Sequence, residues 1–129
     1  MSTFATRFIL LIVFGLLASL GISEGSAAEV PIVVVVKLYP AEGREDEAQA
    51  RLASLAKFVP ANNPGVTFKL HRSVKQPVVF LLYETFPSQA ALDSQSKTVL
   101  PAFFKEFGPT PPGLFAKPNE VDLYRLAGD

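Results

Sequence analysis

Apolar positions along the chain predict four β-strands, two of them buried on both faces. In residues 31–39 and 78–86 both alternating sets of positions are largely apolar, which is typical of strands covered on two sides. Residues 66–73 differ, because apolar residues there alternate with polar ones, so we expect a strand with one exposed face. A last strand is predicted over residues 120–126.

Two amphipathic helices are predicted between these strands. The first begins near Glu45 and ends before Pro60, and its apolar residues recur at spacings of three and four. The second follows Ser88, whose hydroxyl can cap the first turn, and it runs to Val99. Beyond it, residues 101–107 predict a short helical turn. One side of the second helix carries Ala91, Leu92, Gln95 and Val99.

The resulting order, β-α-β-β-α-β, predicts an α+β fold of the ferredoxin-like type with an antiparallel sheet. Right-handed crossovers place the first and third strands in the centre of that sheet, and these are the strands with two apolar faces. Two helices can cover only one face of the sheet, and the other would expose a large apolar patch in a monomer. We therefore expect a homodimer that pairs these second faces.

The N-terminal segment has the features of a secretory signal peptide. Arg7 precedes an apolar run over residues 8–20, and small residues follow up to Ala28. The run is shorter than the roughly 20 residues of a membrane-spanning helix, although an uncleaved anchor is the alternative. We expect a signal peptide over residues 1–28 and one folded domain over residues 29–129, exported and without membrane association after cleavage.

Composition removes several classes of function. The chain has no cysteine, which excludes disulfides and thiolate nucleophiles, and a single histidine argues against a metal site. Twelve basic residues balance twelve acidic residues, so neither nucleic acid nor an anionic membrane surface is indicated as a partner. The sequence contains no glycine-rich phosphate loop and no tryptophan, and we expect no cofactor.

One long run resembles the central signature of the antibiotic biosynthesis monooxygenase family. It reads PGVTFKLHRSVKQPVVFLLYETFPSQAALDSQS over residues 64–96, and the family's first-helix entry has a counterpart, PAEGREDEAQARL, over residues 40–52. The likeness extends over residues 33–126 with its pieces in order. It implies a dimeric α+β barrel, and family members are typically cofactor-free oxygenases of phenolic or quinol substrates. Other members are isomerases, haem degraders or proteins without proven activity.

Two positions differ from the family's pattern. Members usually carry a histidine one turn after the Ala-Ala-Leu helix entry, where this chain has Gln95. The aromatic residue after the strand glutamate is often tryptophan, and here it is Phe86. An amide can orient a substrate by hydrogen bonds but cannot titrate near neutral pH as an imidazole does. The first departure therefore affects acid–base catalysis more than ligand binding.

The candidate catalytic residues are His71, Glu84 and Gln95. Glu84 lies among apolar strand positions, and it is either a carboxylate in a cavity or the partner of an arginine or a helix-end amide, because buried charges are normally paired. His71 falls on the polar face of its strand, so it is either solvent-exposed or a catalytic base. The candidate substrate-binding residues are Arg72, Phe80, Leu82, Phe86 and Phe103.

Some of these candidates have alternative roles. Arg72 either pairs with Glu84 or anchors an anionic ligand. Phe103 belongs to a cluster with Phe104 and Phe107 that forms a core plug, an interface or the wall of a site for an aromatic substrate. We expect an apolar pocket between the helices and the sheet, lined by Val36, Leu38, Phe58, Phe80, Leu82 and Phe103.

Two functions remain open. The first is a cofactor-independent monooxygenase of a small aromatic, phenolic or quinol-like metabolite. Such an enzyme needs an electron-rich substrate in a dry apolar pocket, with a polar group that assists deprotonation. The second is a non-catalytic dimeric domain that binds a small hydrophobic or aromatic molecule. Gln95 favours the second function, whereas His71 and Glu84 favour the first.

Overall fold

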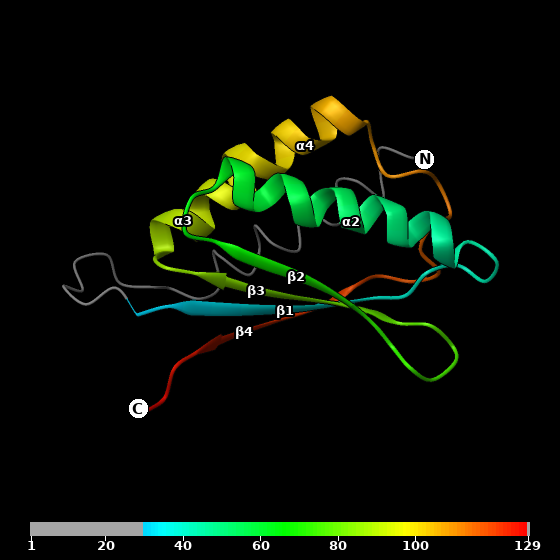
Figure 1. Ribbon diagram of the computed structural model, residues 1–129, viewed down its shortest axis with the longest axis horizontal. Coiled ribbons are helices and arrows are strands. Elements are labelled where there is room, and N and C mark those ends of the chain that lie inside the picture. Colours follow the sequence, from blue (N-terminus) through cyan, green and yellow to red (C-terminus); the bar gives the residue numbers. More distant parts are fainter. Residues whose placement is uncertain (1–29, 129) are drawn as a thin grey trace.

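The computed structural model describes residues 30–128, so the predicted signal peptide lies outside the described residues. The described part of the chain forms two layers, a four-stranded sheet and a set of helices packed on one face of it (Figure 1). Within that part, no helix is long and apolar enough to cross a membrane.

The sheet has the predicted ferredoxin-like topology. Its strands are β1 (Ile32–Leu38), β2 (Thr67–Arg72), β3 (Phe80–Phe86) and β4 (Glu120–Arg125). They lie in the order β2-β3-β1-β4, and every neighbouring pair is antiparallel. The central strands are therefore β1 and β3, the two that the sequence predicts to be buried on both faces, and the α+β fold class is confirmed.

Helix α2 (Glu45–Asn62) packs chiefly against β2. The prediction that this helix ends before Pro60 is wrong, because it continues to Asn62. Pro60 removes a single backbone hydrogen bond within the last turn, and there the Asn62 side-chain amide donates to the Phe58 carbonyl at 2.8 Å. The fully buried residues of α2 belong to the predicted apolar stripe and are Ala48, Leu52 and Val59.

The second helical region is longer than predicted. Helix α3 (Gln89–Ser94) begins after Ser88, whose hydroxyl accepts a hydrogen bond from the Ala91 N–H at 3.1 Å, so the predicted cap is confirmed. It leads directly into a π-helical turn, η1 (Gln95–Val99), and then into α4 (Leu100–Phe107). The predicted second helix and the separate helical turn after it therefore form one continuous helical run.

A proline explains the position of the π-helical turn. In a regular α-helix the ring of Pro101 would press on the Lys97 carbonyl, and its missing N–H would leave that carbonyl without a helical partner. In η1 the Leu100 N–H instead donates to the Gln95 carbonyl, five residues earlier. The helix is thus locally wider where the proline has to be accommodated.

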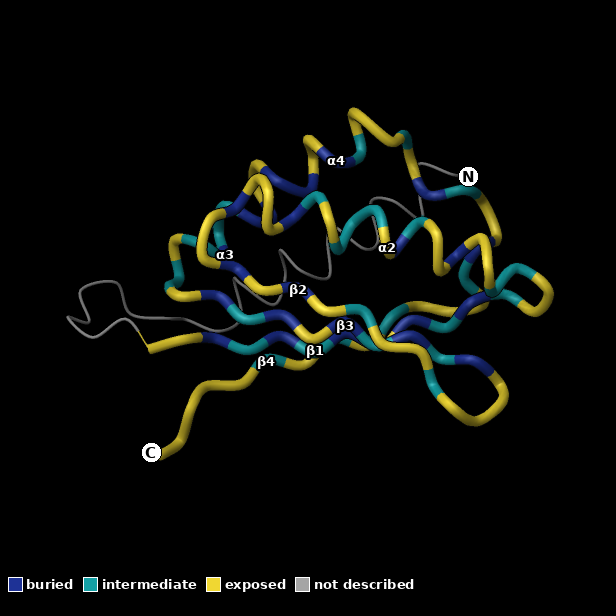
Figure 2. Tube along the Cα trace, in the orientation of Figure 1, coloured by how far each residue is buried: buried dark blue, intermediate teal, exposed yellow. Residues whose placement is uncertain are grey.

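The core lies between the helices and the sheet, as the buried segments in Figure 2 show. Residues of β1 and β3 alternate between this core and the opposite face of the sheet. On the core side, β3 contributes Phe80, Leu82, Glu84 and Phe86. Glu84 is the polar member of this set, so the alternation of the strand places a carboxyl group inside an apolar layer.

The opposite face of the sheet, which we call the open face, is not covered by any described helix (Figure 1). Its centre carries Val33, Val35, Leu81 and Tyr83. Its margin carries the aromatic residue Tyr124 and otherwise polar residues, which are Lys37, Thr67, Lys69, His71, Glu120 and Asp122. Tyr83 is 42% exposed. The centre of the open face is therefore apolar as predicted, and the pairing of two such faces in a homodimer stays a prediction.

Candidate functional site

A cavity of about 70 Å³ lies between the sheet and the helices. Its volume is several times the roughly 10–15 Å³ that holds one water, and it is below the roughly 150 Å³ of a cavity that binds benzene. An aromatic ligand would therefore need the cavity to widen on binding. Most of the wall is apolar and is formed by Val34, Val36, Leu38, Leu52, Leu55, Phe68, Leu82, Leu92, Leu100, Phe103, Phe104, Phe115, Val121 and Leu123.

The polar groups of the wall come from two different parts of the fold. Glu84 of β3 and Gln95 of η1 form what we call the acid end. Arg51 of α2, together with Thr110 and Asn119 from the segment between α4 and β4, forms what we call the loop end. A few polar groups in a largely apolar concave site are the usual means of orienting a small ligand.

Glu84 is a buried carboxyl group without a compensating charge. The residue is only 6% exposed, and among the described residues its carboxyl oxygens have no hydrogen-bond or ion-pair partner. Because burial disfavours the ionised form, the pKa of Glu84 is raised from 4.5 to about 8. At neutral pH the group is therefore mostly protonated, and it can donate a hydrogen bond into the cavity.

Gln95 faces the same cavity and is 2% exposed, which confirms the predicted orientation of this residue toward the sheet. Its side-chain oxygen accepts a hydrogen bond from Asn63 Nδ2 at 3.2 Å. The same Asn63 nitrogen also donates to the Ala91 carbonyl at 3.1 Å. Asn63, at the end of α2, therefore fixes the Gln95 amide and joins the two helical regions above the acid end.

Arg51 lines the cavity near the end of α4. Its guanidinium donates to the carbonyls of Phe107 at 3.0 Å and Gly108 at 2.5 Å, where helix carbonyls lack helical partners. Its guanidinium carbon also lies 5.1 Å from the ring centre of Phe103 and 5.8 Å from that of Phe104. Burial lowers the pKa of Arg51, but an arginine remains charged at neutral pH. The loop end therefore carries a positive charge.

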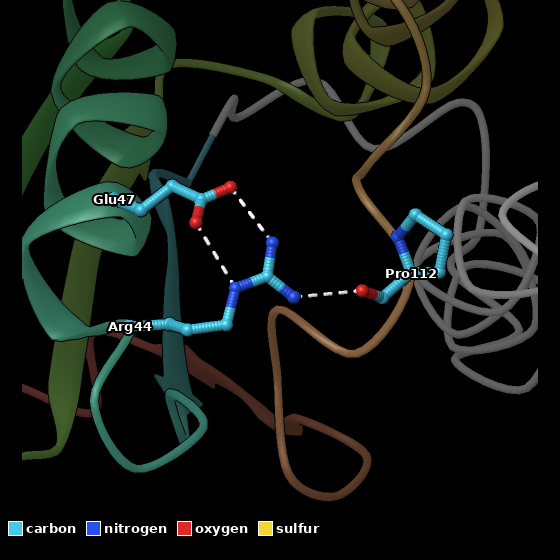
Figure 3. Close-up of polar contacts among 3 residues, drawn as sticks. All are labelled: Arg44, Glu47 and Pro112. Atoms are coloured by element: carbon cyan, nitrogen blue, oxygen red, sulfur yellow. Dashed lines mark hydrogen bonds and ion pairs between the residues drawn. The ribbon is translucent and has the colours of Figure 1, made fainter.

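The segment between α4 and β4 is held against the start of α2. Arg44 binds both carboxylate oxygens of Glu47, at 3.0 and 2.8 Å, and donates to the Pro112 carbonyl at 2.8 Å (Figure 3). One backbone hydrogen bond of 2.8 Å also joins Ala41 N–H to the Leu114 carbonyl, and another of 2.8 Å joins Ala116 N–H to the Tyr39 carbonyl. These contacts position the part of the wall that the segment supplies, which includes Thr110 and Asn119.

Four of the predicted site residues line the cavity and others do not. Glu84, Gln95, Leu82 and Phe103 belong to its wall. Phe80 and Phe86 were expected to bind substrate, and Phe58 was expected to line the pocket. Phe80 and Phe86 are almost fully buried, but none of these three rings contributes to the wall. Phe58 instead packs edge-on against Phe103, with ring centres 5.5 Å apart.

Arg72 contacts neither Glu84 nor the cavity, so its expected role at the site is corrected. Its guanidinium donates to Gln49 at 2.6 Å and forms an ion pair with Asp46 at 3.3 Å, both on α2. The residue stands at the end of β2 on the helix-facing side of the sheet, paired in register with Phe80, and its guanidinium carbon lies 5.8 Å from the Phe80 ring centre. Both sequence-based alternatives for Arg72, pairing with Glu84 and anchoring a ligand in the pocket, therefore lack support.

His71 lies on the open face, where its strand register pairs it with Leu81. It is exposed to solvent and is separated from Glu84 and Gln95 by the sheet. The structure therefore does not bring the three candidate catalytic residues together within one chain. Of the two roles that the sequence left open for His71, a solvent-exposed residue or a catalytic base, its position agrees with the first.

Arg51, Asn63, Thr110 and Asn119 were not predicted as site residues. Arg51 lies outside the apolar stripe of its helix, and Asn63 belongs to an Asn-Asn-Pro-Gly sequence that indicates a turn. Thr110 and Asn119 belong to a segment without helix or strand. The sequence contains no local signal for their position, because the contacts that bring them to the cavity are made with residues far away along the chain.

Comparisons with known proteins agree with this fold. The family model described as antibiotic biosynthesis monooxygenase matches residues 31–100. An uncharacterized protein of Synechocystis sp. is 30% identical over 105 residues, which covers 78% of this chain and 66%, just under two thirds, of that protein.

Solved structures with the same fold include the following two. A proposed antibiotic biosynthesis monooxygenase from Caulobacter crescentus has a TM-score of 0.64 at 24% identity, over 78% of this chain and 92% of that chain. A protein from Pseudomonas aeruginosa has a TM-score of 0.65 at 17% identity, over 80% of this chain and all (100%) of that chain. At these identities the two likenesses establish the fold alone.

Proposed function

Because the chain belongs to the antibiotic biosynthesis monooxygenase family, we propose that it is a cofactor-independent monooxygenase of a small phenolic or quinol-like molecule. The substrate binds in the cavity between the helices and the sheet. The observation that carries this proposal is Glu84, a buried carboxyl group with a pKa of about 8 that faces an apolar cavity without a protein partner among the described residues.

The proposed reaction transfers one atom of O₂ to the ring of the substrate. Loss of the phenolic proton gives a phenolate, which is electron-rich enough to reduce O₂. A carbon–oxygen bond forms at a ring carbon, the oxygen–oxygen bond breaks, and the second oxygen atom leaves as water with two hydrogens from the substrate. The product is a quinone, and the substrate supplies all four electrons, so the reaction needs no external reductant.

Glu84 is suited to accept the phenolic proton. Its pKa of about 8 lies much nearer to a phenol pKa of about 10 than an ordinary carboxyl pKa of about 4.3 does. Proton transfer is most effective when the pKa of the base is close to the working pH. Since the carboxylate is the active form of a base, turnover should rise with pH and level off above about pH 8.

Gln95 is suited to orient the substrate rather than to exchange protons. Asn63 occupies its side-chain oxygen, which leaves the amide N–H groups as the donors available to an oxygen of the substrate. The apolar wall excludes water from the phenolate and from reactive oxygen intermediates.

We also propose that the functional unit is a homodimer joined through the open face. The apolar centre of that face, Val33, Val35, Leu81 and Tyr83, and its polar margin resemble the apolar core and polar rim of protein interfaces. Export after removal of residues 1–28 is a further part of this proposal, and it rests on the sequence alone.

A second candidate function is a non-catalytic binding domain with the same fold. One observation favours it: the residue at the usual position of the family's helix histidine is Gln95, whose amide is already engaged by Asn63. In this case Glu84 would act as a protonated hydrogen-bond donor to a bound molecule, and no chemistry would follow.

One experiment separates the two functions. The purified protein is mixed with a panel of phenols and quinols, and oxygen uptake and thermal shift are measured together, with Glu84→Gln as the matched variant. Uptake above the uncatalysed rate that is lost in Glu84→Gln supports the oxygenase. A thermal shift without uptake selects the binding domain, and the absence of both contradicts the two proposals.

A further inference from the structure

The guanidinium of Arg51 is a positive charge in the cavity wall that no carboxylate neutralises. Among the described residues the ion pairs are made by Arg44 and Arg72, and none involves Arg51. The other ionisable group of the wall, Glu84, is mostly protonated at neutral pH because burial raises its pKa. Burial also lowers the pKa of Arg51, which means that its surroundings disfavour the charge. A cation in a largely apolar wall therefore lacks a counter-charge.

The carbonyl groups at the end of α4 use only part of the Arg51 guanidinium. Two of its N–H groups donate to the carbonyls of Phe107 and Gly108, and the C-terminus of a helix corresponds to about half a negative charge. A guanidinium has five N–H groups and a full positive charge. Three N–H groups and about half of the charge therefore have no protein partner in the described part of the chain.

A ligand in the cavity can reach this guanidinium. Arg51 belongs to the cavity wall, and it is half-buried rather than enclosed. Its guanidinium carbon lies 5.1 Å from the ring centre of Phe103 and 5.8 Å from that of Phe104, and both rings also line the cavity. A ligand group that packs against these two rings would therefore lie beside the N–H groups of Arg51.

A carboxylate is the ligand group that fits this position best. A cationic group would meet a repulsive charge, and a neutral group would leave the charge of Arg51 uncompensated. A carboxylate accepts two N–H groups of a guanidinium in one plane and brings a single negative charge. A phosphate brings up to two negative charges, and the excess over the single cation of the wall would be unfavourable beside apolar side chains.

The helices place this charge well away from the acid end. Gln95 precedes Phe103 by eight residues in one continuous helical run, which corresponds to about 12 Å along the helix axis. Asn63, which holds the Gln95 amide, follows Arg51 by twelve residues at the end of α2, which corresponds to about 18 Å. A ligand that contacts both Glu84 and Arg51 must therefore be elongated, with an apolar middle that matches the wall between them.

We propose that the ligand of this cavity carries a carboxylate group and that Arg51 binds it. The substrate class is thus an elongated phenolic acid, with its hydroxyl group toward Glu84 and its carboxylate toward the loop end. This inference rests on the proposed binding of a phenolic molecule in the cavity. Arg51 is a specificity-determining residue in this arrangement, and it takes no part in proton transfer.

The test uses three phenolic acids of increasing length, para-hydroxybenzoate, para-hydroxyphenylpropanoate and para-hydroxybiphenylcarboxylate. Each acid is compared with its methyl ester and its primary amide, which lack the charge. Dissociation constants are measured by calorimetry at pH 6 without oxygen, so that no turnover occurs and Glu84 is protonated. The proteins are wild type, Arg51→Gln and Arg51→Met, which lack the positive charge, and Arg51→Lys, which retains it. Lys57→Gln removes an exposed charge from the same helix and is the matched control.

We expect at least one acid to bind wild type about tenfold more tightly than its ester and its amide, the ratio that one charge-assisted hydrogen bond supplies. The ratio should fall to about one in Arg51→Gln and Arg51→Met, remain above one in Arg51→Lys and persist in Lys57→Gln. Equal affinities of every acid, ester and amide for wild type overturn the inference while the proposed phenol binding stands. Binding of none of these probes overturns both. A ratio that persists in Arg51→Gln or Arg51→Met, or that is lost in Lys57→Gln, refutes the role of Arg51.

A second measurement needs no variant and covers the case in which the Arg51 variants do not fold. In nitrogen-15-labelled wild type, the Nε–H signal of Arg51 should shift when the tightest-binding acid is added and shift far less with its ester. An equal response to the acid and the ester, or no response to a bound acid, overturns the inference.

Discussion

Replacement of Glu84 by glutamine should stabilise the protein, and the gain should increase with pH. The pKa of this carboxyl group is 4.5 in an unfolded chain and about 8 in the folded protein, because burial disfavours its charge. Between these values the folded state holds a proton that the unfolded state has released. The free energy of unfolding of wild type therefore falls as pH rises through this interval.

The size of the effect follows from the two pKa values. Each pH unit within the interval costs about 1.4 kcal/mol of stability. The carboxyl group should thus cost almost nothing below pH 4.5, about 3 kcal/mol at pH 7 and about 5 kcal/mol above pH 8, where the loss levels off. Glutamine has nearly the same shape and does not titrate, so Glu84→Gln should lack this dependence.

Urea unfolding at pH 5, 7 and 9 measures the difference directly. The free energies of unfolding of wild type and Glu84→Gln should be similar at pH 5 and separate by several kcal/mol at pH 9. Glu42→Gln, which changes an exposed glutamate, is the matched control and should follow wild type. A constant difference between Glu84→Gln and wild type at all three pH values would refute the neutral buried carboxyl group and remove the proposed base.

Further predictions concern the site, the assembly and processing. Gln95→Leu should weaken binding or turnover of a phenolic ligand, and Gln95→His should raise oxygen uptake; unchanged kinetics in both variants would exclude Gln95 from the site. Turnover by wild type should increase up to about pH 8 as Glu84 ionises, and a flat pH profile would contradict Glu84 as the base. Light scattering should give a dimer that Val35→Asp dissociates, whereas a wild-type monomer at micromolar concentration would disprove pairing of the open faces. N-terminal sequencing of exported protein should find a terminus within a few residues of Glu29, and an intact segment over residues 1–25 would contradict cleavage.

Most of the fold could be predicted from the sequence because local patterns and topology agree. Apolar runs and one alternating pattern predicted four strands to within about two residues, and the two runs with apolar residues at both sets of positions identified the two central strands. The helix termini were harder to predict, since they depend on contacts that a pattern does not contain. The extension of α2 beyond Pro60 and the continuous helical run through Pro101 are the two clear examples.

The site could be predicted only where periodicity decides which face a residue occupies. Alternation placed Glu84 toward the helices, and helical spacing placed Gln95 toward the sheet. Alternation places Phe80 and Phe86 on the core side, where both are buried, but it does not tell which core residues border the cavity, and these two do not. Alternation also places Arg72 on the helix-facing side of β2, but it does not predict that the partners there are Asp46 and Gln49 of α2. Asn119 is positioned by a long segment whose path depends on contacts distant in sequence.

The π-helical turn η1 restricts how the length of this chain can change. Each residue of an α-helix accounts for about 100° of rotation, and a π-helical turn holds one residue more than an α-helical turn. The loss of one residue from η1 should therefore restore a regular α-helical turn and keep α4 close to its orientation relative to α3, whereas the loss of a second residue would rotate α4 by about 100° and take Phe103 out of the core. Relatives that retain both faces should therefore differ by at most one residue between Leu92 and Phe103. Differences in length should accumulate in the segments over residues 73–79 and 108–118.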